Sequence, residues 1–293
     1  MKIALCLSGY FDSLKDTTSR GHDGHAYIKK HILARATDDC EVDVFYHNWE
    51  PHLEEEVAQL YQPKSYMVEE QIDFVKIAEA HNVSRKDLDP YGQLGSWSMT
   101  SKHGAGYVGP ERLLSQYYST QKSFELKKQY EEEHGFTYDC AIKARFDLGR
   151  INRATSGPGK QNPFACQCIN FDPSLDMNQL YMVYWDLFNE GPADMWFYSS
   201  SENMDHFCHV YDKVLKEYLP AESDYSAAAT TGWPESCRDQ YRTNEVLKTP
   251  EERSKDLHRY PPFLTVNGIL LMKWFLMDTG LWKKAAALHA DWE

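Results

Sequence analysis

The residues best suited to chemistry lie between Tyr138 and Asp147, where a short apolar stretch ends in a charged Arg-x-Asp sequence. Side chains alternate between the two faces of a strand, so this segment predicts two contrasting faces. One is apolar, with Cys140, Ile142, Ala144 and Phe146, and the other charged, with Asp139, Lys143, Arg145 and Asp147. Open α/β sheets bind ligands at the carboxyl ends of their strands, so this pattern favours a phosphorylated ligand, with or without a metal ion. An ordinary salt-bridged strand end would produce the same pattern.

The elements that must position this segment indicate an α/β sheet. Strands are predicted over Lys2 to Leu7, Val42 to Trp49 and Ser65 to Val68, with helices over His25 to Ala36 and Glu54 to Tyr61 between them. This alternation favours a parallel, doubly wound sheet.

The later part of the chain has a different texture. A long helix over Glu111 to Glu133 leads into the Arg-x-Asp strand. Shorter, aromatic-rich pieces follow Arg150: strands at Leu180 to Trp185 and Met195 to Tyr198, a helix over Asn203 to Tyr218, and a terminal apolar run with a final helix. The closest candidate for a linker, Thr155 to Pro163, is short, so the 293 residues are expected to form one domain.

Composition excludes several classes of protein. The formal net charge is -13 and no Lys/Arg-rich run offsets it, which argues against binding to nucleic acid or anionic membranes. The seven cysteines show no repeating spacing, which indicates reduced thiols in the cytosol. The N-terminus lacks a signal-peptide pattern, and no apolar stretch reaches the ~18 residues of a membrane span. We expect a cytoplasmic protein without membrane insertion.

Other motifs carry less weight. Gly104 to Gly109 matches G-x-G-x-x-G, but a polar stretch replaces the strand that must precede it in a dinucleotide site. A glycine loop before Pro110, at a helix start, is the favoured interpretation, and its N–H groups suit a diphosphate. His206, Cys208 and His209 lack the paired spacing of a closed zinc site. Hydrolase and P-loop functions are disfavoured, because neither a G-x-S-x-G elbow nor a Walker A sequence is present.

Together these pieces resemble the nucleotide-sugar glycosyltransferases of the GT-A fold, particularly the cytoplasmic ones of bacterial polysaccharide clusters and large algal viruses. The matching segments, over about the first two thirds of the chain, are Lys2 to Gly9, Asp43 to Trp49, Tyr61 to Lys64, Ser115 to Ser119, Tyr138-Asp139 with Arg145 to Asp147, and Ala193 to Trp196. Among viral members the xylosyltransferase type is the most similar. The resemblance implies a Rossmann-like, mostly parallel sheet flanked by helices, with a donor-binding half over residues 1–150 and an acceptor-binding half over 151–293.

The resemblance also implies a donor site. In that fold the loop after the first strand and acidic residues after a neighbouring strand hold the nucleoside. In this chain they would be Ser8, Gly9, Tyr10 and Asp73, with Glu69 or Glu70 as substitutes for Asp73. Gln116, in the matching part of the long helix, joins this donor-binding set.

The chain departs from the family in its D-x-D motif, which usually binds a divalent ion, because Arg145 stands in place of the first aspartate. A guanidinium can neutralise a diphosphate directly, with Lys143 as a second cation. Asp147 remains able to hold Mn²⁺ or Mg²⁺. Metal-dependent binding and metal-independent binding through Arg145 are therefore both open.

The implied reaction is displacement at the anomeric carbon of a nucleoside-diphosphate sugar by a glycan acceptor. A UDP-sugar is the expected donor, xylose is one candidate sugar, and inversion is expected with retention left open. Arg145 would stabilise the leaving group, and Asp194 is the expected base for the acceptor hydroxyl, with Asp73 and Glu190 as alternatives. Four tryptophans are candidate platforms for the acceptor sugar, namely Trp97, Trp185, Trp196 and Trp233.

Two other functions fit parts of the pattern. A noncatalytic carbohydrate- or nucleotide-binding module would keep the fold and bind through Lys143 and Arg145 without turnover. A methyltransferase on a Rossmann-like sheet would carry a glycine-rich turn after the first strand, and the single Gly9 gives it little support.

Overall fold

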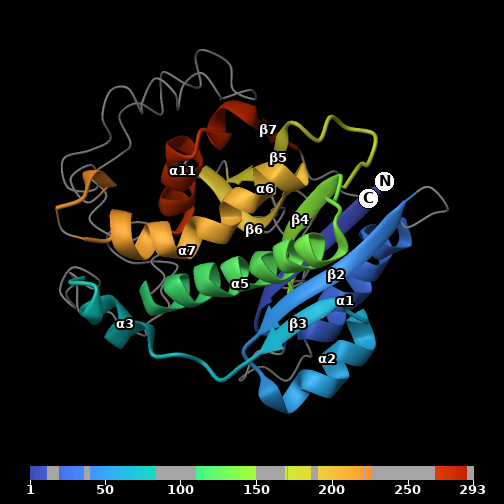
Figure 1. The fold of residues 1–293 in the computed structure, drawn as a ribbon, viewed down its shortest axis with the longest axis horizontal. Coiled ribbons are helices and arrows are strands. Elements are labelled where there is room, and N and C mark those ends of the chain that lie inside the picture. The colour runs from blue at the N-terminus through green and yellow to red at the C-terminus, as the bar shows by residue number, and fades with distance from the viewer. Residues whose placement is uncertain are drawn as a thin grey trace, which may run out of the picture.

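The computed structural model describes residues 1–11, 20–35, 40–83, 110–149, 169, 171–185, 191–220, 222–225 and 268–288. A seven-stranded sheet with the order β3-β2-β1-β4-β6-β5-β7 forms its centre (Figure 1). In chain order the strands are β1 Lys2–Gly9, β2 Glu41–Asn48, β3 Ser65–Val68, β4 Cys140–Arg145, β5 Leu180–Trp185, β6 Gly191–Ser199 and β7 Ala285–Ala287.

One strand of this described sheet runs against the other six. β3, β2, β1 and β4 pair in parallel, β6 pairs antiparallel with both β4 and β5, and β7 is parallel to β5. The protein therefore has an α/β fold with a mostly parallel sheet, as the sequence predicts. The reversal of β6 also places its first residues beside the carboxyl ends of β1 and β4.

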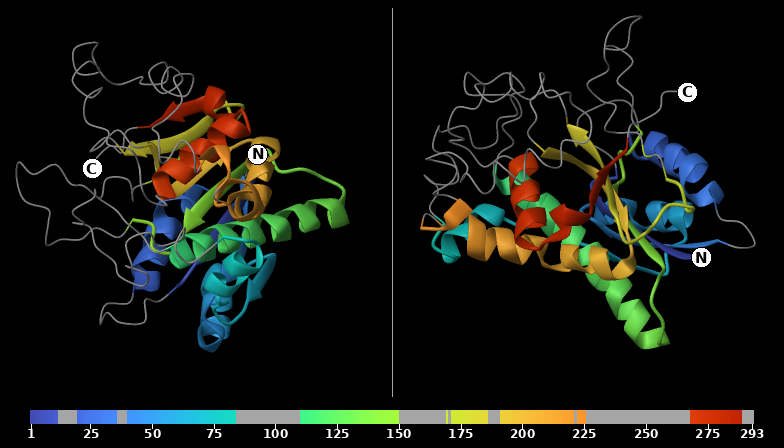
Figure 2. Two further views of the ribbon diagram at one scale, coloured as in Figure 1. Left: turned by 90° about the vertical axis from the view of Figure 1, so that its left-hand side faces the viewer. Right: turned by 90° about the horizontal axis from the view of Figure 1, so that it is seen from above.

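Helices cover both faces of the sheet. One face carries α3 Phe74–Ala80, α5 Pro110–His134, α6 Ser201–Asp205, α7 Val210–Lys213 and α11 Gly268–Asp278. The other face carries α1 Arg20–His31 and α2 Glu54–Tyr61. The right-hand view of Figure 2 shows the sheet between α11 and α1. The fold is thus three layers thick, with a hydrophobic core on each side of the sheet.

The central strand β1 explains why both faces need cover. Ile3, Leu5 and Leu7 pack toward α1 and α2, whereas Ala4 and Cys6 belong to the core under α5. All five side chains are fully buried. A parallel strand that is buried on both faces reads as a nearly continuous apolar run, which is how this segment appears in the sequence.

Most predicted elements are confirmed. α2, β3 and β5 have the predicted bounds, and α5 extends the predicted helix by one residue at each end. α1 begins at Arg20, earlier than the predicted His25. The first turn was missed because Gly24 weakens the helical pattern of the sequence. Glycine is nevertheless required there for steric reasons. A Cβ at this position would lie 1.8 Å from the carbonyl oxygen of Phe146.

The second half of the chain departs further from expectation. The helix predicted over Asn203 to Tyr218 consists of α6, a 3₁₀ turn over His206–His209, α7, and a π-helical turn over Val214–Tyr218. Hydrophobic periodicity does not distinguish these hydrogen-bonding patterns. β7 was not predicted either, because its three alanines favour a helix until pairing with β5 overrides that preference. The short helix α3 was also missed.

The helices in the described ranges include none that is long and apolar enough to cross a bilayer. The glycine sequence Gly104 to Gly109 and the loop Thr155 to Pro163 lie outside the described residues.

Candidate functional site

The candidate site lies where the order of the parallel strands reverses. The chain moves from β1 to β2 on one side and later returns to β4 on the other side of β1. Ligands of open α/β sheets bind outside the carboxyl ends of the strands at such a switch point. Ser8, near the end of β1, pairs in register with Arg145 at the end of β4. The structure therefore brings the predicted residues of both strands to one edge.

Arg145 and Asp147 form a bidentate ion pair at this edge. Arg145 Nε donates to Asp147 Oδ1 at 2.8 Å, and Nη2 donates to Oδ2 at 2.7 Å. The side chains are partly exposed, at 33% and 24%. Burial acts to raise the pKa of Asp147, but the charge and hydrogen bonds of Arg145 outweigh it and hold that pKa below its usual value. The carboxylate is thus ionised and neutralises the guanidinium that the sequence assigns to a phosphate.

Asp194 reaches the same edge from β6. It was predicted just before an apolar strand but lies inside it, because pairing with β5 extends β6 back to Gly191. Gln116 Nε2 of α5 donates to Asp194 Oδ2 at 2.7 Å. The Lys143 ammonium of β4 donates to the carbonyl oxygen of Asp194. Asp194, the expected base, therefore forms one cluster with Gln116 and Lys143, which were both predicted to bind the donor.

Lys143 lies behind this cluster. Its side chain is only 1% exposed, and Nζ is 5.7 Å from the centroid of the Phe197 ring. Burial lowers the pKa of Lys143 to about 8, although the nearby Asp194 acts to raise it. Direct contact with a ligand, as predicted, would require a change that exposes this buried ammonium. In the observed geometry it supports Asp194 from within the sheet.

Of the four residues predicted on the charged face of this strand, Lys143, Arg145 and Asp147 lie toward its carboxyl end, whereas Asp139 lies away from the site. Asp139 precedes β4 and lies at its amino end, where Oδ2 accepts a hydrogen bond of 2.6 Å from the backbone N–H of Lys2. Residues of one face can lie a full strand length apart, so a shared face does not bring Asp139 to the carboxyl edge.

The turn at the end of β1 is attached to α5. Gly9 has φ +107°, a conformation that favours glycine, and its N–H donates to Ser119 Oγ at 2.8 Å. Ser8 Oγ lies 3.2 Å from Thr120 Oγ1. Tyr10 is 37% exposed and its hydroxyl donates to Gln71 Oε1 at 2.7 Å. The three residues predicted to hold the nucleoside thus form an ordered turn with an exposed aromatic side chain.

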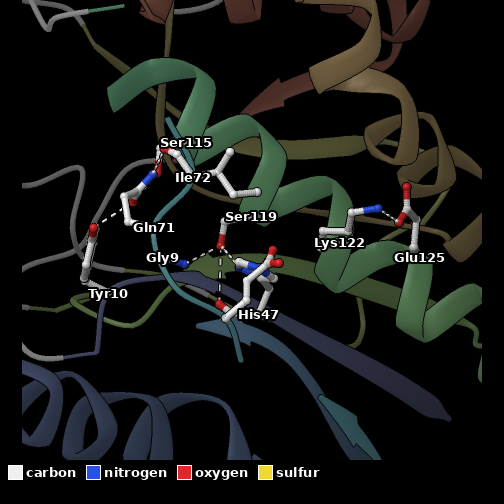
Figure 3. A network of polar contacts seen from close by, with 10 residues as sticks. Gly9, Tyr10, His47, Gln71, Ile72, Ser115, Ser119, Lys122 and Glu125 are labelled. Carbon is white, nitrogen blue, oxygen red and sulfur yellow. Dashed lines mark hydrogen bonds and ion pairs between the residues drawn. The ribbon is translucent and has the colours of Figure 1, made fainter. Parts of the chain in front are cut away.

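A buried histidine connects this turn to the segment after β3 (Figure 3). His47 Nδ1 is 2.8 Å from Ser119 Oγ, and Nε2 is 2.9 Å from Glu69 Oε1. Gln71 Oε1 also accepts from Ser115 Oγ at 3.1 Å. The sequence analysis assigned no individual role to His47, Ser115, Ser119 or Gln71. The available signal was the polar His-Asn pair at the end of an apolar strand.

Asn48 completes this edge and was also missed. Its side chain is fully buried, and neither amide atom has a hydrogen-bond partner in the described part of the chain. It is paired in register with Gly9. Buried polar groups are nearly always hydrogen-bonded, so an unpaired amide beside the turn is an unusual feature of this edge.

Asp73 has a structural role in this conformation. Its Oδ1 accepts from the N–H of Lys76 at 3.2 Å, which caps α3, and its Oδ2 lies 3.1 Å from Lys76 Nζ. Within the described chain it makes no hydrogen bond or ion pair with Arg145 or Asp194. Of its predicted substitutes, Glu69 is bound to His47 and Glu70 is exposed. The predicted nucleoside and base roles of Asp73 remain predictions.

The predicted tryptophan platforms for the acceptor sugar find no support in the described residues. Trp196 is 1% exposed and packs in the core beneath α1 and α2, so it offers no platform in this conformation. The side chain of Trp185 is not described. Trp97, Trp233 and the alternative base Glu190 lie outside the described residues.

The donor atoms at this edge do not fit a preformed metal site. Both oxygens of Asp147 accept hydrogen bonds from Arg145, and Asp194 is bound to Gln116. Nowhere in the described residues do three or more His, Cys, Asp or Glu side chains gather in a geometry suited to a metal, including around His206 and Cys208. Asp147 as a ligand of Mn²⁺ or Mg²⁺ therefore stays a prediction.

Comparison with protein-family models finds no match to the chain, and comparison with curated proteins finds none either. The functional interpretation therefore depends on the geometry of this edge and on the residues that the sequence analysis singled out.

Proposed function

We propose that the chain is a glycosyltransferase of the GT-A type that moves a sugar from a nucleoside-diphosphate donor to a glycan acceptor. One observation carries the proposal. Arg145 at the end of β4 and Asp194 on the antiparallel neighbour β6 lie at the same edge of the sheet, and Lys143 of β4 binds the Asp194 backbone. A cation for the leaving group and a carboxylate for the acceptor hydroxyl are the two groups that an inverting transfer requires.

Arg145 would bind the diphosphate. Its guanidinium is partly exposed and forms a bidentate ion pair with Asp147. A partly exposed ion pair contributes only ~0–1 kcal/mol, so a doubly charged diphosphate can displace Asp147 at little cost in free energy. As the bond to the anomeric carbon breaks, negative charge grows on the departing diphosphate, and the fixed guanidinium stabilises that charge.

Asp194 would accept the proton of the acceptor hydroxyl. Gln116 donates to one carboxylate oxygen and leaves Oδ1 able to act as the base. The Lys143 ammonium fixes the backbone of the same residue, which limits the movement of the carboxylate. The resemblance favours a UDP-sugar as donor, and xylose is one of the sugars to be tested.

Donor binding is the first test. We would measure binding of UDP, GDP and dTDP sugars and of CMP sugars by thermal shift and calorimetry, each with and without Mn²⁺. One nucleoside diphosphate should stabilise the wild type, and Arg145→Ala should weaken its binding at least tenfold, or about 1.4 kcal/mol. Lys30→Ala removes the same charge from an exposed position near the end of α1 and should leave binding unchanged. Absence of binding by every nucleotide would overturn the proposal.

Turnover is the second test and separates an enzyme from a binding module. Asp194→Asn preserves the shape of the side chain and can still accept from Gln116, but it cannot take a proton at neutral pH. We expect sugar transfer or donor hydrolysis to fall by about 10²–10⁴-fold, the usual contribution of a general base, with donor affinity nearly unchanged. Binding without any turnover in the wild type would instead favour the noncatalytic carbohydrate- or nucleotide-binding module.

A further inference from the structure

A chain of buried hydrogen bonds lies directly beneath the turn that ends β1. It runs from the Gly9 N–H to Ser119 Oγ at 2.8 Å, on to His47 Nδ1 at 2.8 Å, and from His47 Nε2 to Glu69 Oε1 at 2.9 Å. We call it the Ser119–His47–Glu69 chain. Figure 3 shows Ser119 on α5 and His47 on β2, and Glu69 is the residue that follows β3 in the chain. Ser119 and His47 are both 0% exposed.

Glu69 and the Gly9 N–H, at the two ends of this chain, determine where the hydrogens on His47 and Ser119 lie. An ionised carboxylate only accepts hydrogen bonds, so the contact with Glu69 places a hydrogen on Nε2 of His47. In the neutral ring Nδ1 is then an acceptor and takes the single hydroxyl hydrogen of Ser119. The lone pairs of Ser119 Oγ are left to accept the Gly9 N–H. The tautomer of His47 therefore determines which way the Ser119 hydroxyl points.

We infer that His47 is a positioning residue that, through Ser119, fixes the turn at Gly9 against which the ligand must lie. The turn ends β1 at the switch point, and a Cβ added to Gly9 would meet no atom of the described residues within 4 Å, so these residues leave one side of the turn open to a bound molecule. The nature of that molecule, a nucleoside diphosphate, rests on the proposed function. The role of His47 in holding the turn does not.

Protonation of His47 should loosen the turn. A proton taken from water onto Nδ1 adds a second donor to Ser119 Oγ, beside the Gly9 N–H. Among the described residues, the Ser119 hydroxyl hydrogen then has the carbonyl oxygen of His47 as its remaining acceptor, at 3.3 Å. Two donors now share the two lone pairs of one oxygen, and the positively charged ring draws electron density away from it, so the hydrogen bond from Gly9 weakens. The conformation of the turn thus becomes dependent on pH.

The surroundings of His47 set the direction of this dependence. Burial lowers its pKa, and Lys122 acts in the same direction. The hydrogen bond and charge of Glu69, and the charge of Glu125, act to raise it. The ring of Tyr118 also packs against it, at 5.6 Å between centroids. The net pKa lies below the ordinary 6.5, so the folded chain holds His47 neutral at pH 7.

The lowered pKa of His47 also makes the stability of the folded protein depend on pH. Above pH 6.5 neither the folded nor the unfolded chain protonates this histidine, so its contribution to folding is complete. As the pH falls below 6.5 the unfolded chain takes up the proton first, and stability decreases until the pH reaches the folded pKa.

The inference can be tested on the ligand-free protein. The sequence contains two Ser-Gly pairs, Ser8-Gly9 and Ser156-Gly157. Serine labelled with ¹³C at the carbonyl and glycine labelled with ¹⁵N therefore select only two amide signals. We expect one of them, from Gly9, to move upfield as the pH falls, with a midpoint below 6.5 that matches the titration of the His47 ring. A Gly9 signal that ignores the titration of His47 would overturn the inference.

Two variants separate positioning from simple packing. His47→Asn keeps an acceptor near the place of Nδ1 but has no group that titrates, so the Gly9 signal should lose its pH step. Glu69→Gln keeps the side chain but removes the charge that raises the pKa of His47, so the midpoint should move to lower pH. Glu70→Gln, at an exposed neighbouring position, should leave the midpoint in place. An unchanged midpoint in Glu69→Gln would contradict the chain of contacts.

Donor binding gives an independent readout. His47→Ala should weaken the nucleotide that binds the wild type by about tenfold at pH 8, where His47 is neutral, with Ser119→Ala having a similar effect. If no nucleotide binds even the wild type while Gly9 still follows His47, the proposed function fails and the positioning role stands. If a nucleotide binds normally and Gly9 ignores His47, the positioning role fails and the proposed function stands.

Discussion

Arg145 and Asp147 neutralise each other at the edge where a charged ligand is expected. Their bidentate geometry is well formed, but both side chains are partly exposed. Water screens such a pair and limits its net contribution to ~0–1 kcal/mol. The same guanidinium can therefore change partners when a diphosphate offers two charged oxygens in place of one carboxylate. The pair keeps Arg145 oriented in the free protein.

Replacing Asp147 should change donor affinity in opposite directions, depending on whether Asp147 competes for Arg145 or binds a metal ion. If Arg145 binds the diphosphate without metal, Asp147→Asn removes a competing carboxylate and should tighten donor binding by up to about fivefold, equivalent to about 1 kcal/mol. Calorimetry would measure this change. Asp139→Asn, which removes the same charge at the other end of β4, should have no effect. Weaker binding in Asp147→Asn, together with loss of any Mn²⁺ dependence, would identify Asp147 as a metal ligand.

Among the described elements, α5 packs against three strands and two α-helices, namely β1, β2, β3, α3 and α7. Its first half supplies Gln116 to Asp194 and Ser119 to Gly9, while its second half is tied to α6 by the buried Lys127. Lys127 is 0% exposed, and its ammonium contacts Asp205 and lies 2.9 Å from Glu131. Burial acts to lower the pKa of Lys127, but these carboxylates raise it overall. The helix that positions the site is therefore held by charges at its far end.

Removing this lysine should destabilise the protein. Lys127→Met fills a similar volume but leaves two carboxylates without their cation, and breaking a buried pair in this way costs about 3–5 kcal/mol. Asp205 is 27% exposed, so we expect the low end of that range. Lys122→Met, which breaks the more exposed pair with Glu125, should cost less than about 1 kcal/mol. Urea unfolding would measure both, and equal effects would contradict the buried network.

At the scale of the whole molecule, one sheet joins the two halves of the chain. β4 of the first half pairs with β6 of the second, and α5 packs against α7. Each hydrophobic core draws residues from both halves. Within the described residues, the two halves 1–150 and 151–293 thus share one sheet and both hydrophobic cores, and a single domain with a donor-binding and an acceptor-binding half stays a prediction.

If the chain unfolds as a single cooperative unit, its buried thiols should become exposed at the same urea concentration. Cys6, Cys40 and Cys140 lie in the first half and Cys208 in the second, and all four are free and buried. Pulsed thiol labelling with mass spectrometry should give one urea midpoint for all of them. Exposure of Cys208 at a clearly lower urea concentration would mean that the second half unfolds separately.

Local sequence patterns are sufficient to predict the parallel half of the sheet. Alternating apolar strands and periodic helices are local patterns, and β1, β2, α2, β3 and α5 all form where those patterns predict. The placement of Arg145 and Asp147 at the end of a strand also follows from the sequence, because polar residues directly after a buried run must lie at the edge of a sheet. Asp194 was predicted just before an apolar strand and lies inside β6, and its role as the base stays a prediction.

Tertiary structure decided the contacts between residues distant in the chain. Only the reversal of β6 brings Asp194 to Gln116 and Lys143, and no local pattern encodes the direction in which a strand enters a sheet. The role of His47 likewise requires that α5 place Ser119 beside it, 72 positions later in the sequence. Propensity and periodicity act within one element, whereas these contacts depend on how whole elements pack, and packing is settled by the complete core.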